Sequence, residues 1–340
     1  MKILLYDAEN SVIRMRYPQK FIFEELGHSV DIFDWSYYFS TKSKGSIGRK
    51  LFDRIFVNLI QKKINEDLLV AASKGGYDLL FIMMGKHIYP ETLLQIKEYV
   101  KLLAIWSTDD IYNMRSSSFN VIKSIPHYDL IFSPRLHLFD EFKKLGSESV
   151  KLIDWYPHPE LMDEARETLV NNHDFSFVGS WSSYREDTLT PLLCSAHRLG
   201  VYGWGWEHKV SRKFKGLGLE CNSHVPLLKM REIFQTSKIN INILTRENRD
   251  TSNLRNFEIP ASKSFQLAER SDHLLNLFEE EKEIVCFSGI EELKSKCDFY
   301  LKNDTARERI AQAGYKRLVK GSHTLKARLK LVIDNVNQLL

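Results

Sequence analysis

The chain has 340 residues, and at about 150 residues per domain this is the length of two ordinary domains. Hydrophobic residues make up 43% of it and charged residues 27%, which is typical of a soluble globular chain with enough material for two cores. The 48 basic and 44 acidic residues leave a net charge of +4, and so small an excess argues against a dedicated nucleic-acid-binding protein.

Neither a membrane span nor an export signal is expected from the sequence. No stretch of 18 apolar residues occurs, and the first ten residues, MKILLYDAEN, lack the apolar core of a signal peptide. The cysteines at 194, 221, 286 and 297 show no CxxC spacing, which argues against a zinc site or a disulfide framework. We therefore expect a cytoplasmic protein that holds neither a metal nor a cofactor.

The first half of the chain alternates apolar strand-like runs with helical patterns. The predicted strands are 2–6, 29–33, 77–83, 101–106, 128–132 and 150–153, and the predicted helices are 16–26, 47–74, 90–99 and 135–145. Gly27 and Gly146 stand where C-cap glycines belong. Such alternation predicts an α/β domain built on a parallel sheet with helices on both faces.

The alternation breaks over 154–172 and then restarts. Further strands are predicted at 174–179, 201–205, 238–244, 265–268 and 284–287, and helices at 185–199, 225–236, 254–263, 272–281, 290–302, 304–319 and 324–338. We predict an N-terminal domain over 1–155, a linker over 156–173, a second domain over 174–322, and a closing helix in 323–340 that packs on the first domain. Ligands are expected beyond the carboxyl ends of the strands.

The segment from Asp250 to Lys263, DTSNLRNFEIPASK, follows the buried strand ININIL. Arg255 and Glu258 are three residues apart and share one helix face, and Asp250 lies in the loop before them. A cation for phosphate and carboxylates for sugar hydroxyls suit a nucleotide-sugar pocket. The alternative is an ordinary ion pair on a solvated helix face.

A second segment, FVGSWSSYRED, ends a strand at Gly179 and continues through Ser180 to Arg185 at the start of a helix. A glycine there lets the backbone approach a ligand, and helix N–H groups favour an anion. The alternative is a plain strand-to-helix turn. Trp204 and Trp206 in VYGWGW offer indole faces for a base or a sugar, although burial is expected for one of them.

Three candidates for activating a hydroxyl follow strands of the first half: His87, Asp109 with its neighbour Asp110, and the loop from Asp7 to Glu9. Each has a structural alternative as a capping, turn or loop residue. The basic segment 37–63, which lies in the sequence between Glu9 and His87, carries a helical apolar stripe. This pattern suits either contact with an anionic membrane surface or a core helix with a solvated basic face.

The order of several motifs in the second half resembles a known family. DFSFVGS with an arginine six residues after its glycine, then VYGWGW, SKININIL and LRNFEIPASKSFQLAE, is similar to the group 1 glycosyltransferase superfamily. Within it, the R-x-F-E signature resembles the spore-maturation-protein-like branch. The resemblance covers residues 174–335 and implies the GT-B fold, in which two Rossmann-like domains face each other across a cleft and the second binds the donor.

The resemblance also implies roles for individual residues. Glu258 would contact the ribose of the donor, Asp250 would be the first acidic position of the pair, and Arg185 would bind the diphosphate. Ser180 stands where the family has a further cation, and Arg255 is the candidate for the missing charge. Two departures concern the helix itself: Lys263 occupies the place of a capping glycine, and Pro260 lies inside the helix.

The sequence thus predicts a metal-independent glycosyltransferase of the retaining type. It would move a sugar from a nucleotide-activated donor to a hydroxyl of a glycan or a lipid-linked acceptor, without a nucleic-acid partner. His87, Asp109 and Asp250 are the predicted catalytic residues, while Gly179, Ser180, Arg185, Trp204, Arg255, Glu258 and Lys263 are the predicted donor-binding residues. The alternatives are a nucleotide-sugar 2-epimerase of the same fold and a non-enzymatic sugar- or nucleotide-binding protein.

Overall fold

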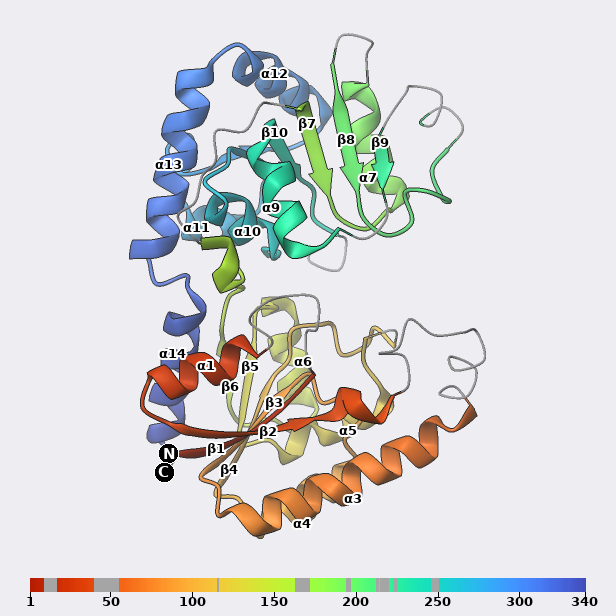
Figure 1. Cartoon of the computed structure of the whole chain (residues 1–340), viewed down its shortest axis with the longest axis vertical. Coiled ribbons are helices and arrows are strands. Elements are labelled where there is room, and N and C mark those ends of the chain that lie inside the picture. Colours follow the sequence, from red (N-terminus) through yellow and green to blue (C-terminus); the bar gives the residue numbers. More distant parts are fainter. Residues whose placement is uncertain are drawn as a thin grey trace. The chain divides into compact units, whose positions relative to one another are not determined.

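The computed structural model describes residues 1–8, 17–39, 55–114, 116–162, 172–193, 197–211, 214, 220–222, 225–245 and 251–340 (Figure 1). These residues form two compact units. The first holds the described residues up to Asp154 together with Leu325–Leu340, and the second holds those from Trp155 to Thr324. In the described part of the chain, no helix is both long and apolar enough to span a bilayer.

The first unit contains a six-stranded parallel sheet in the order β2-β1-β3-β4-β5-β6. Its strands are β1 (Lys2–Asp7), β2 (Ser29–Asp34), β3 (Leu79–Met83), β4 (Leu102–Trp106), β5 (Leu130–Ser133) and β6 (Val150–Leu152). The order reverses at β1, which lies between β2 and β3, so that the crevice beyond the carboxyl ends of β1 and β3 is where such a sheet binds ligands.

Helices cover both faces of this sheet. They are α1 (Pro18–Glu25), α3 (Val57–Gly75), α4 (Pro90–Ile96), α5 (Phe119–Ser124), α6 (Phe139–Lys144) and α14 (Leu325–Asn337), with short 3-10 turns η1 (Trp35–Tyr38), η3 (Ile125–His127) and η4 (Leu136–Leu138). Leu4 and Tyr6 pack with Ile64 and Leu68 of α3 on one face. On the other face, Phe23 of α1 meets Phe81 edge to face at 5.5 Å.

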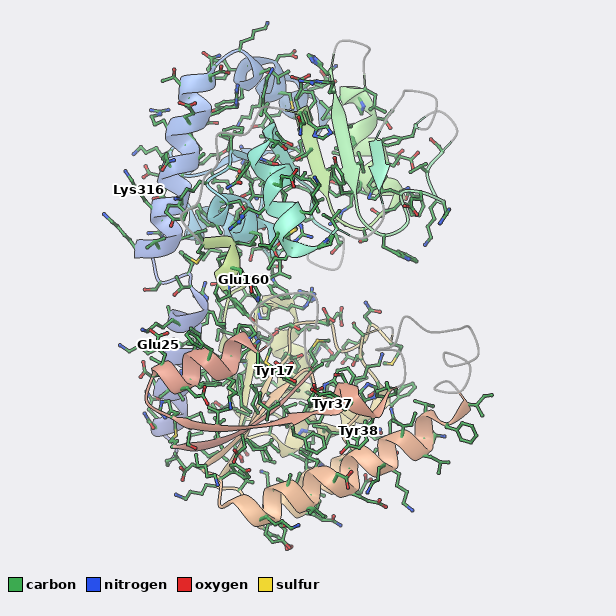
Figure 2. The ribbon with its side chains drawn as sticks, viewed as in Figure 1. Tyr17, Glu25, Tyr37, Tyr38, Glu160 and Lys316 are labelled. Carbon is green, nitrogen blue, oxygen red and sulfur yellow. The ribbon has the colours of Figure 1, made fainter. Side chains whose placement is uncertain are left out.

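The last helix of the chain, α14, lies beside α1 (Figure 1). Lys326 of α14 pairs with Glu25 at the end of α1, which is labelled in Figure 2. Deeper in the unit, Arg328 Nη2 lies 3.8 Å from a carboxylate oxygen of Asp154, and both side chains are largely buried. Burial lowers the pKa of Arg328, an effect that the charge of Asp154 opposes.

The second unit contains another six-stranded parallel sheet, in the order β12-β11-β10-β7-β8-β9. Its strands are β7 (His173–Val178), β8 (Leu199–Tyr202), β9 (Glu220–Asn222), β10 (Ser237–Asn242), β11 (Gln266–Glu269) and β12 (Val285–Phe287). Here the order reverses between β7 and β10, which gives this sheet its own ligand-binding crevice at their carboxyl ends.

The helices of this unit are α7 (Ser183–Leu189), α9 (Leu227–Gln235), α10 (Arg255–Ala261), α11 (Asp272–Leu277), α12 (Ile290–Leu301) and α13 (Asp304–Lys320), with 3-10 turns η5 (Pro159–Met162) and η6 (Thr190–Leu192). Alternate strand residues build two cores. Phe175 and Phe177 pack with Tyr300 of α12, whereas Val178 packs with Phe234 and Phe257 of α9 and α10.

The predicted architecture of parallel sheets with helices is confirmed in both halves of the chain. Gly27 and Gly146 have φ angles of +86° and +93°, as C-cap glycines do. That the two domains face each other across a cleft stays a prediction.

Some of the predicted elements were wrong. The predicted helix 185–199 ends much earlier, because α7 stops at Leu189 and a 3-10 turn with Pro191 follows. Helix α5 and strand β9 were not predicted at all. The first part of the predicted helix 47–74, up to residue 54, lies outside the described residues.

Candidate functional site

The carboxyl ends of the strands in the second sheet bring the sequence-predicted donor residues together. We call this the donor edge: residues 179–182 after β7, 203–206 after β8, 243–245 after β10, 251–258 leading into α10, and 269–271 after β11. It includes the point between β7 and β10 where the strand order reverses, which is where the topology favours a ligand. Asp250 lies outside the described residues.

Arg185 is buried in α7 and stabilises this edge from within. Its guanidinium donates to the carbonyl oxygen of Ile243 from Nη2 at 2.7 Å and from Nε at 3.2 Å. Nη1 donates to the carbonyl and hydroxyl oxygens of Ser180 at 2.9 and 3.2 Å. The group also lies 5.2 Å from the ring centre of Phe177. Arg185 therefore ties the segment after β7 to the end of β10, and Ser180 is one of its partners.

Arg255 and Glu258 form the predicted pair, but as a nearly buried contact rather than a surface one. The Glu258 side chain is 8% exposed and that of Arg255 is 26% exposed, and Nη1 of Arg255 bonds Oε2 of Glu258. Nε of Arg255 donates to the carbonyl oxygen of Val178 at 2.9 Å. The pair thus connects α10 to the end of β7, which rules out the alternative of an ordinary pair on a solvated helix face.

Asparagines hold the segment that leads into α10. The amides of Asn242 and Asn253 exchange two hydrogen bonds of 3.0 Å, and Asn253 N–H donates to Oδ1 of Asn256 at 2.8 Å. All three are buried. Because the segment is fixed by paired amides, Arg255 is presented at a defined position next to β7.

Two glycines let the segments after β7 and β8 approach each other closely. Gly203 has a φ of +134°, and a Cβ there would lie 2.2 Å from the carbonyl oxygen of Gly179. The same carbonyl accepts a hydrogen bond from the indole of Trp206 at 2.7 Å, and Trp206 is fully buried. Trp204 is 60% exposed. The expected division between one buried and one accessible tryptophan is confirmed.

Glu269, which the sequence analysis did not single out, also belongs to the donor edge. Its Oε2 accepts from the backbone N–H of Leu244 at 2.8 Å, and its Oε1 bonds the hydroxyl of Tyr184. The signal for Glu269 in the sequence was a carboxylate directly after the predicted strand 265–268. Glu269 joins β11, β10 and α7 at the edge.

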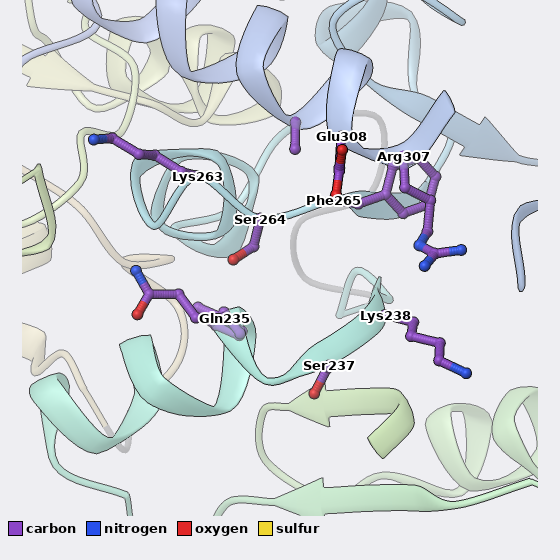
Figure 3. Close-up of a pocket in the computed structure, with 10 residues that line it drawn as sticks. Gln235, Ser237, Lys238, Lys263, Ser264, Phe265, Arg307 and Glu308 are labelled. Carbon is purple, nitrogen blue, oxygen red and sulfur yellow. The ribbon is translucent and has the colours of Figure 1, made fainter. Parts of the chain in front are cut away.

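Lys263 is not grouped with the other predicted donor residues. It has a φ of +55°, a conformation that a capping glycine would adopt without strain, and its ammonium lies 4.8 Å from the ring centre of Tyr315. It lines a pocket with Gln235, Ser237, Lys238, Ser264 and Arg307 (Figure 3). Since Ser237 and Lys238 begin β10, this pocket lies at the amino ends of the strands, opposite the donor edge.

In the first unit, His87 follows β3 within an aromatic enclosure. Its ring centre lies 4.8 Å from that of Trp35 and 4.9 Å from that of Phe39, and its Nδ1 lies 3.2 Å from the amide nitrogen of Gln61. Burial, with a smaller effect from Lys86, lowers the pKa of His87 to about 4. The imidazole is therefore neutral at pH 7.

Asp109 and Asp110 follow β4. An oxygen of Asp109 lies 3.6 Å from Nη2 of the buried Arg135, and Asp110 accepts from the backbone N–H of Tyr112 at 2.9 Å. Both aspartates line a small hollow with Met84, whose φ is +66°. Positive φ at a non-glycine residue is uncommon and often accompanies functional sites.

Asp7 and Asp34 lie at the ends of β1 and β2 and are neighbours in register. Their proximity was not expected from the sequence. Asp34 accepts from the hydroxyl of Tyr17 at 2.7 Å and from the backbone N–H of Ser36 at 2.8 Å. Burial raises the pKa of Asp7 to about 7, assisted by the charge of Asp34 and opposed by a hydrogen bond from Ala8 N–H. Glu9 lies outside the described residues.

Comparison with known proteins places the chain in a family. A family model described as glycosyl transferase-like matches residues 160–334, slightly more than half of the chain. The chain therefore belongs to the glycosyl transferase-like family and is a glycosyltransferase. The spore protein CgeB of Bacillus subtilis (strain 168) is 23% identical to it over 298 residues, which cover 81% of this chain and 88% of that protein.

Solved structures share the fold at lower identity. An alpha-glucosyltransferase in complex with UDP-glucose and DNA containing an abasic site is 14% identical, with a TM-score of 0.68 over 99% of both chains. HepE of Anabaena in complex with UDP-glucose is 11% identical, with a TM-score of 0.61 over 99% of this chain and 100% of that one. Sucrose-phosphate synthase from Thermosynechococcus elongatus is 12% identical, with a TM-score of 0.65 over 100% and 99%. The predicted GT-B fold is confirmed, and the roles of individual residues stay predictions.

Proposed function

We propose that this glycosyltransferase uses a uridine-diphosphate sugar as its donor and binds it at the donor edge of the second unit. The observation that carries the proposal is the nearly buried Arg255–Glu258 pair, fixed against the end of β7 beside the reversal point of the sheet. A guanidinium suits a phosphate and a carboxylate suits a vicinal diol, and charge-assisted hydrogen bonds of this kind contribute about 1.5–3 kcal/mol each. The complexes of the alpha-glucosyltransferase and of HepE with UDP-glucose support the choice of uridine.

Calorimetry on the full chain tests the donor. We expect UDP to bind more tightly than GDP or ADP, and uridine alone to bind weakly. Glu258→Gln should weaken UDP binding about tenfold, because about 1.4 kcal/mol corresponds to one decade. Arg255→Ala should weaken UDP binding far more than uridine binding. Unchanged affinities in both variants would move the donor site away from α10.

The acceptor is proposed to be a hydroxyl of a glycan or a lipid-linked sugar, without a nucleic-acid partner. His87, Asp109, Asp110 and Asp7 are the candidate groups for it, because they follow strands of the first unit. Incubating the protein with a labelled UDP-sugar, with and without candidate acceptors, tests this step. Transfer should require an acceptor, whereas release of an altered sugar from the donor alone would indicate a 2-epimerase. The anomeric configuration of the product tests the proposed retaining outcome.

Neither a metal nor a cofactor is part of the proposed reaction. Cations of the protein would offset the charge of the leaving diphosphate, so that turnover should persist after extensive treatment with a chelator. Loss of turnover on chelation, with recovery on adding Mg²⁺ or Mn²⁺, would contradict this part of the proposal.

A cytoplasmic location with peripheral membrane contact through segment 37–63 completes the proposal. The part of α3 within this segment exposes Leu59 at 63%, and Ile55 just before the helix is 64% exposed. Apolar side chains beside lysines and arginines suit an anionic bilayer surface. Cosedimentation with vesicles of anionic lipid should fall in the Ile55→Ser/Leu59→Ser double variant, and binding equal to that of the parent protein would exclude this contact.

A further inference from the structure

Lys209 follows residues 203–206, the segment of the donor edge that comes after β8. Its ammonium nitrogen lies 3.9 Å from the ring centre of Trp204 and 5.6 Å from that of Trp181. Its backbone N–H donates to the carbonyl oxygen of Gly205 at 2.9 Å. A cation held over indole rings is attracted to their π-faces while it stays within reach of solvent.

The two indoles are themselves held in place. The N–H of Trp181 donates to Oε2 of Glu186 at 2.7 Å, which fixes the orientation of its ring. The backbone N–H of Trp181 donates to the carbonyl oxygen of Trp204 at 2.8 Å, so that the segments after β7 and β8 are joined. Lys209 is thereby positioned beside Trp181, Trp204 and Gly205 by contacts that involve both segments.

The arginines that the structure describes at the donor edge or beside it are already engaged with oxygens of the protein. Arg185 donates to Ile243 and Ser180, Arg255 donates to Val178 and bonds Glu258, and Arg270 pairs with Glu280 and Glu292. By contrast, the Lys209 ammonium makes no hydrogen bond or ion pair with any described residue. Its charge is therefore available to an anion that reaches the ends of β7 and β8.

We propose that Lys209 binds the diphosphate of the donor, with Trp181 and Trp204 holding its ammonium toward the ends of β7 and β8. This inference rests on the proposed function, because it takes a nucleotide sugar as the ligand of the donor edge. Lys209, rather than Arg185, would then bind the phosphate oxygens of the donor. An ammonium is a compact charge with three donors, which suits the oxygens of a diphosphate.

Calorimetry on the full chain with UDP and uridine tests the proposal. Lys209→Met keeps an unbranched side chain of similar length and removes the charge, and it should weaken UDP binding at least tenfold while leaving uridine binding unchanged. Lys209→Arg should retain most of the affinity for UDP. Lys316→Met on α13, an exposed lysine labelled in Figure 2, is the matched control and should bind UDP as the parent protein does.

Salt dependence provides a second readout. Because the proposed contact is between exposed charges, UDP affinity of the parent protein should fall with rising NaCl more steeply than that of Lys209→Met. Equal UDP affinities of the parent and Lys209→Met would overturn the inference and leave the proposed donor site standing. Failure of the parent protein to bind UDP, GDP and ADP alike would overturn the proposed function and this inference with it.

Discussion

Replacing Arg185 separates a structural role from a ligand-binding role at the donor edge. The side chain is 6% exposed, and its guanidinium donates to the carbonyl oxygen of Ile243, a fully buried residue, and to two oxygens of Ser180. We therefore expect Arg185→Met to destabilise the second unit and to affect donor binding only through the loss of that structure.

The magnitude follows from the bonds that are lost. A hydrogen bond from a charged group contributes about 1.5–3 kcal/mol, and leaving a buried carbonyl without a donor costs about 1–3 kcal/mol. Because Ser180 regains contact with water in the variant, the contributions do not simply add. We expect a loss of about 3 kcal/mol in the free energy of unfolding, a large fraction of the roughly 5–15 kcal/mol that holds a typical domain together.

Urea unfolding followed by tryptophan fluorescence measures this loss, since Trp181, Trp204 and Trp206 lie in the second unit. Arg185→Lys should be intermediate, because one ammonium cannot bond Ile243 and Ser180 as a guanidinium does. UDP affinity is measured by calorimetry at a temperature where each variant is folded. An unchanged urea midpoint together with a tenfold or greater loss of UDP affinity would refute the structural role and make Arg185 a direct ligand of the diphosphate.

Four further substitutions test the electrostatics and packing of both units. Asp7→Asn should be more stable than the parent protein by up to about 4 kcal/mol above pH 7, because the parent must ionise a buried carboxyl whose pKa is about 7. The difference in stability should vanish below about pH 4. Equal urea midpoints of the two proteins across this pH range would contradict the prediction. The stability that neutral His87 contributes is present above pH 6.5 and is lost as the pH falls toward 4, so His87→Gln should abolish about 3 kcal/mol of the acid destabilisation measured by urea titration. Trp204→Ala should change stability by less than about 0.5 kcal/mol but weaken UDP binding, because Trp204 is exposed. Trp206→Phe loses the hydrogen bond to Gly179 and should lower the thermal midpoint. A stability loss in Trp204→Ala together with weaker UDP binding in Trp206→Phe alone would exchange the two roles.

The strands were predictable wherever their apolar pattern was continuous. ILLY, LLFIM and LLAIW are buried on both faces of a parallel sheet, and such strands have an apolar signal that does not depend on their neighbours. Strand β9 has the sequence ECN and lies at the edge of the second sheet, where it pairs with β8. Its polar residues carry no periodicity, so only the tertiary structure identifies it.

The donor edge was predictable as a set of strand ends, but the contacts within it were not. The spacing of Arg255 and Glu258 predicts a shared helix face, and it does not reveal that the helix packs against the end of β7 with the carboxylate nearly buried. The pairing of Asn242 with Asn253 brings together residues 11 apart in the chain, which no local pattern in the sequence indicates. Neighbours in register, such as Asp7 and Asp34, likewise become visible only when the strand order is known.

A sequence motif identifies the cations near a strand end, but it does not reveal which of them are already bonded to oxygens of the protein. Arginines attract attention in a motif because they bind phosphate, yet a guanidinium has five donors and is equally suited to joining backbone carbonyls. Among the described residues here, the guanidiniums of Arg185, Arg255 and Arg270 bond oxygens of the protein, so under our proposal a diphosphate would meet chiefly the charge of Lys209. Since the Arg255–Glu258 pair is neutral as a unit, UDP would gain Arg255 only by taking over its bond to Glu258, and a ribose diol on the carboxylate would offset the cost of separating the two charges. Binding of nucleoside and of diphosphate should therefore be coupled through this pair, whereas the contact with Lys209 requires no internal bond to break.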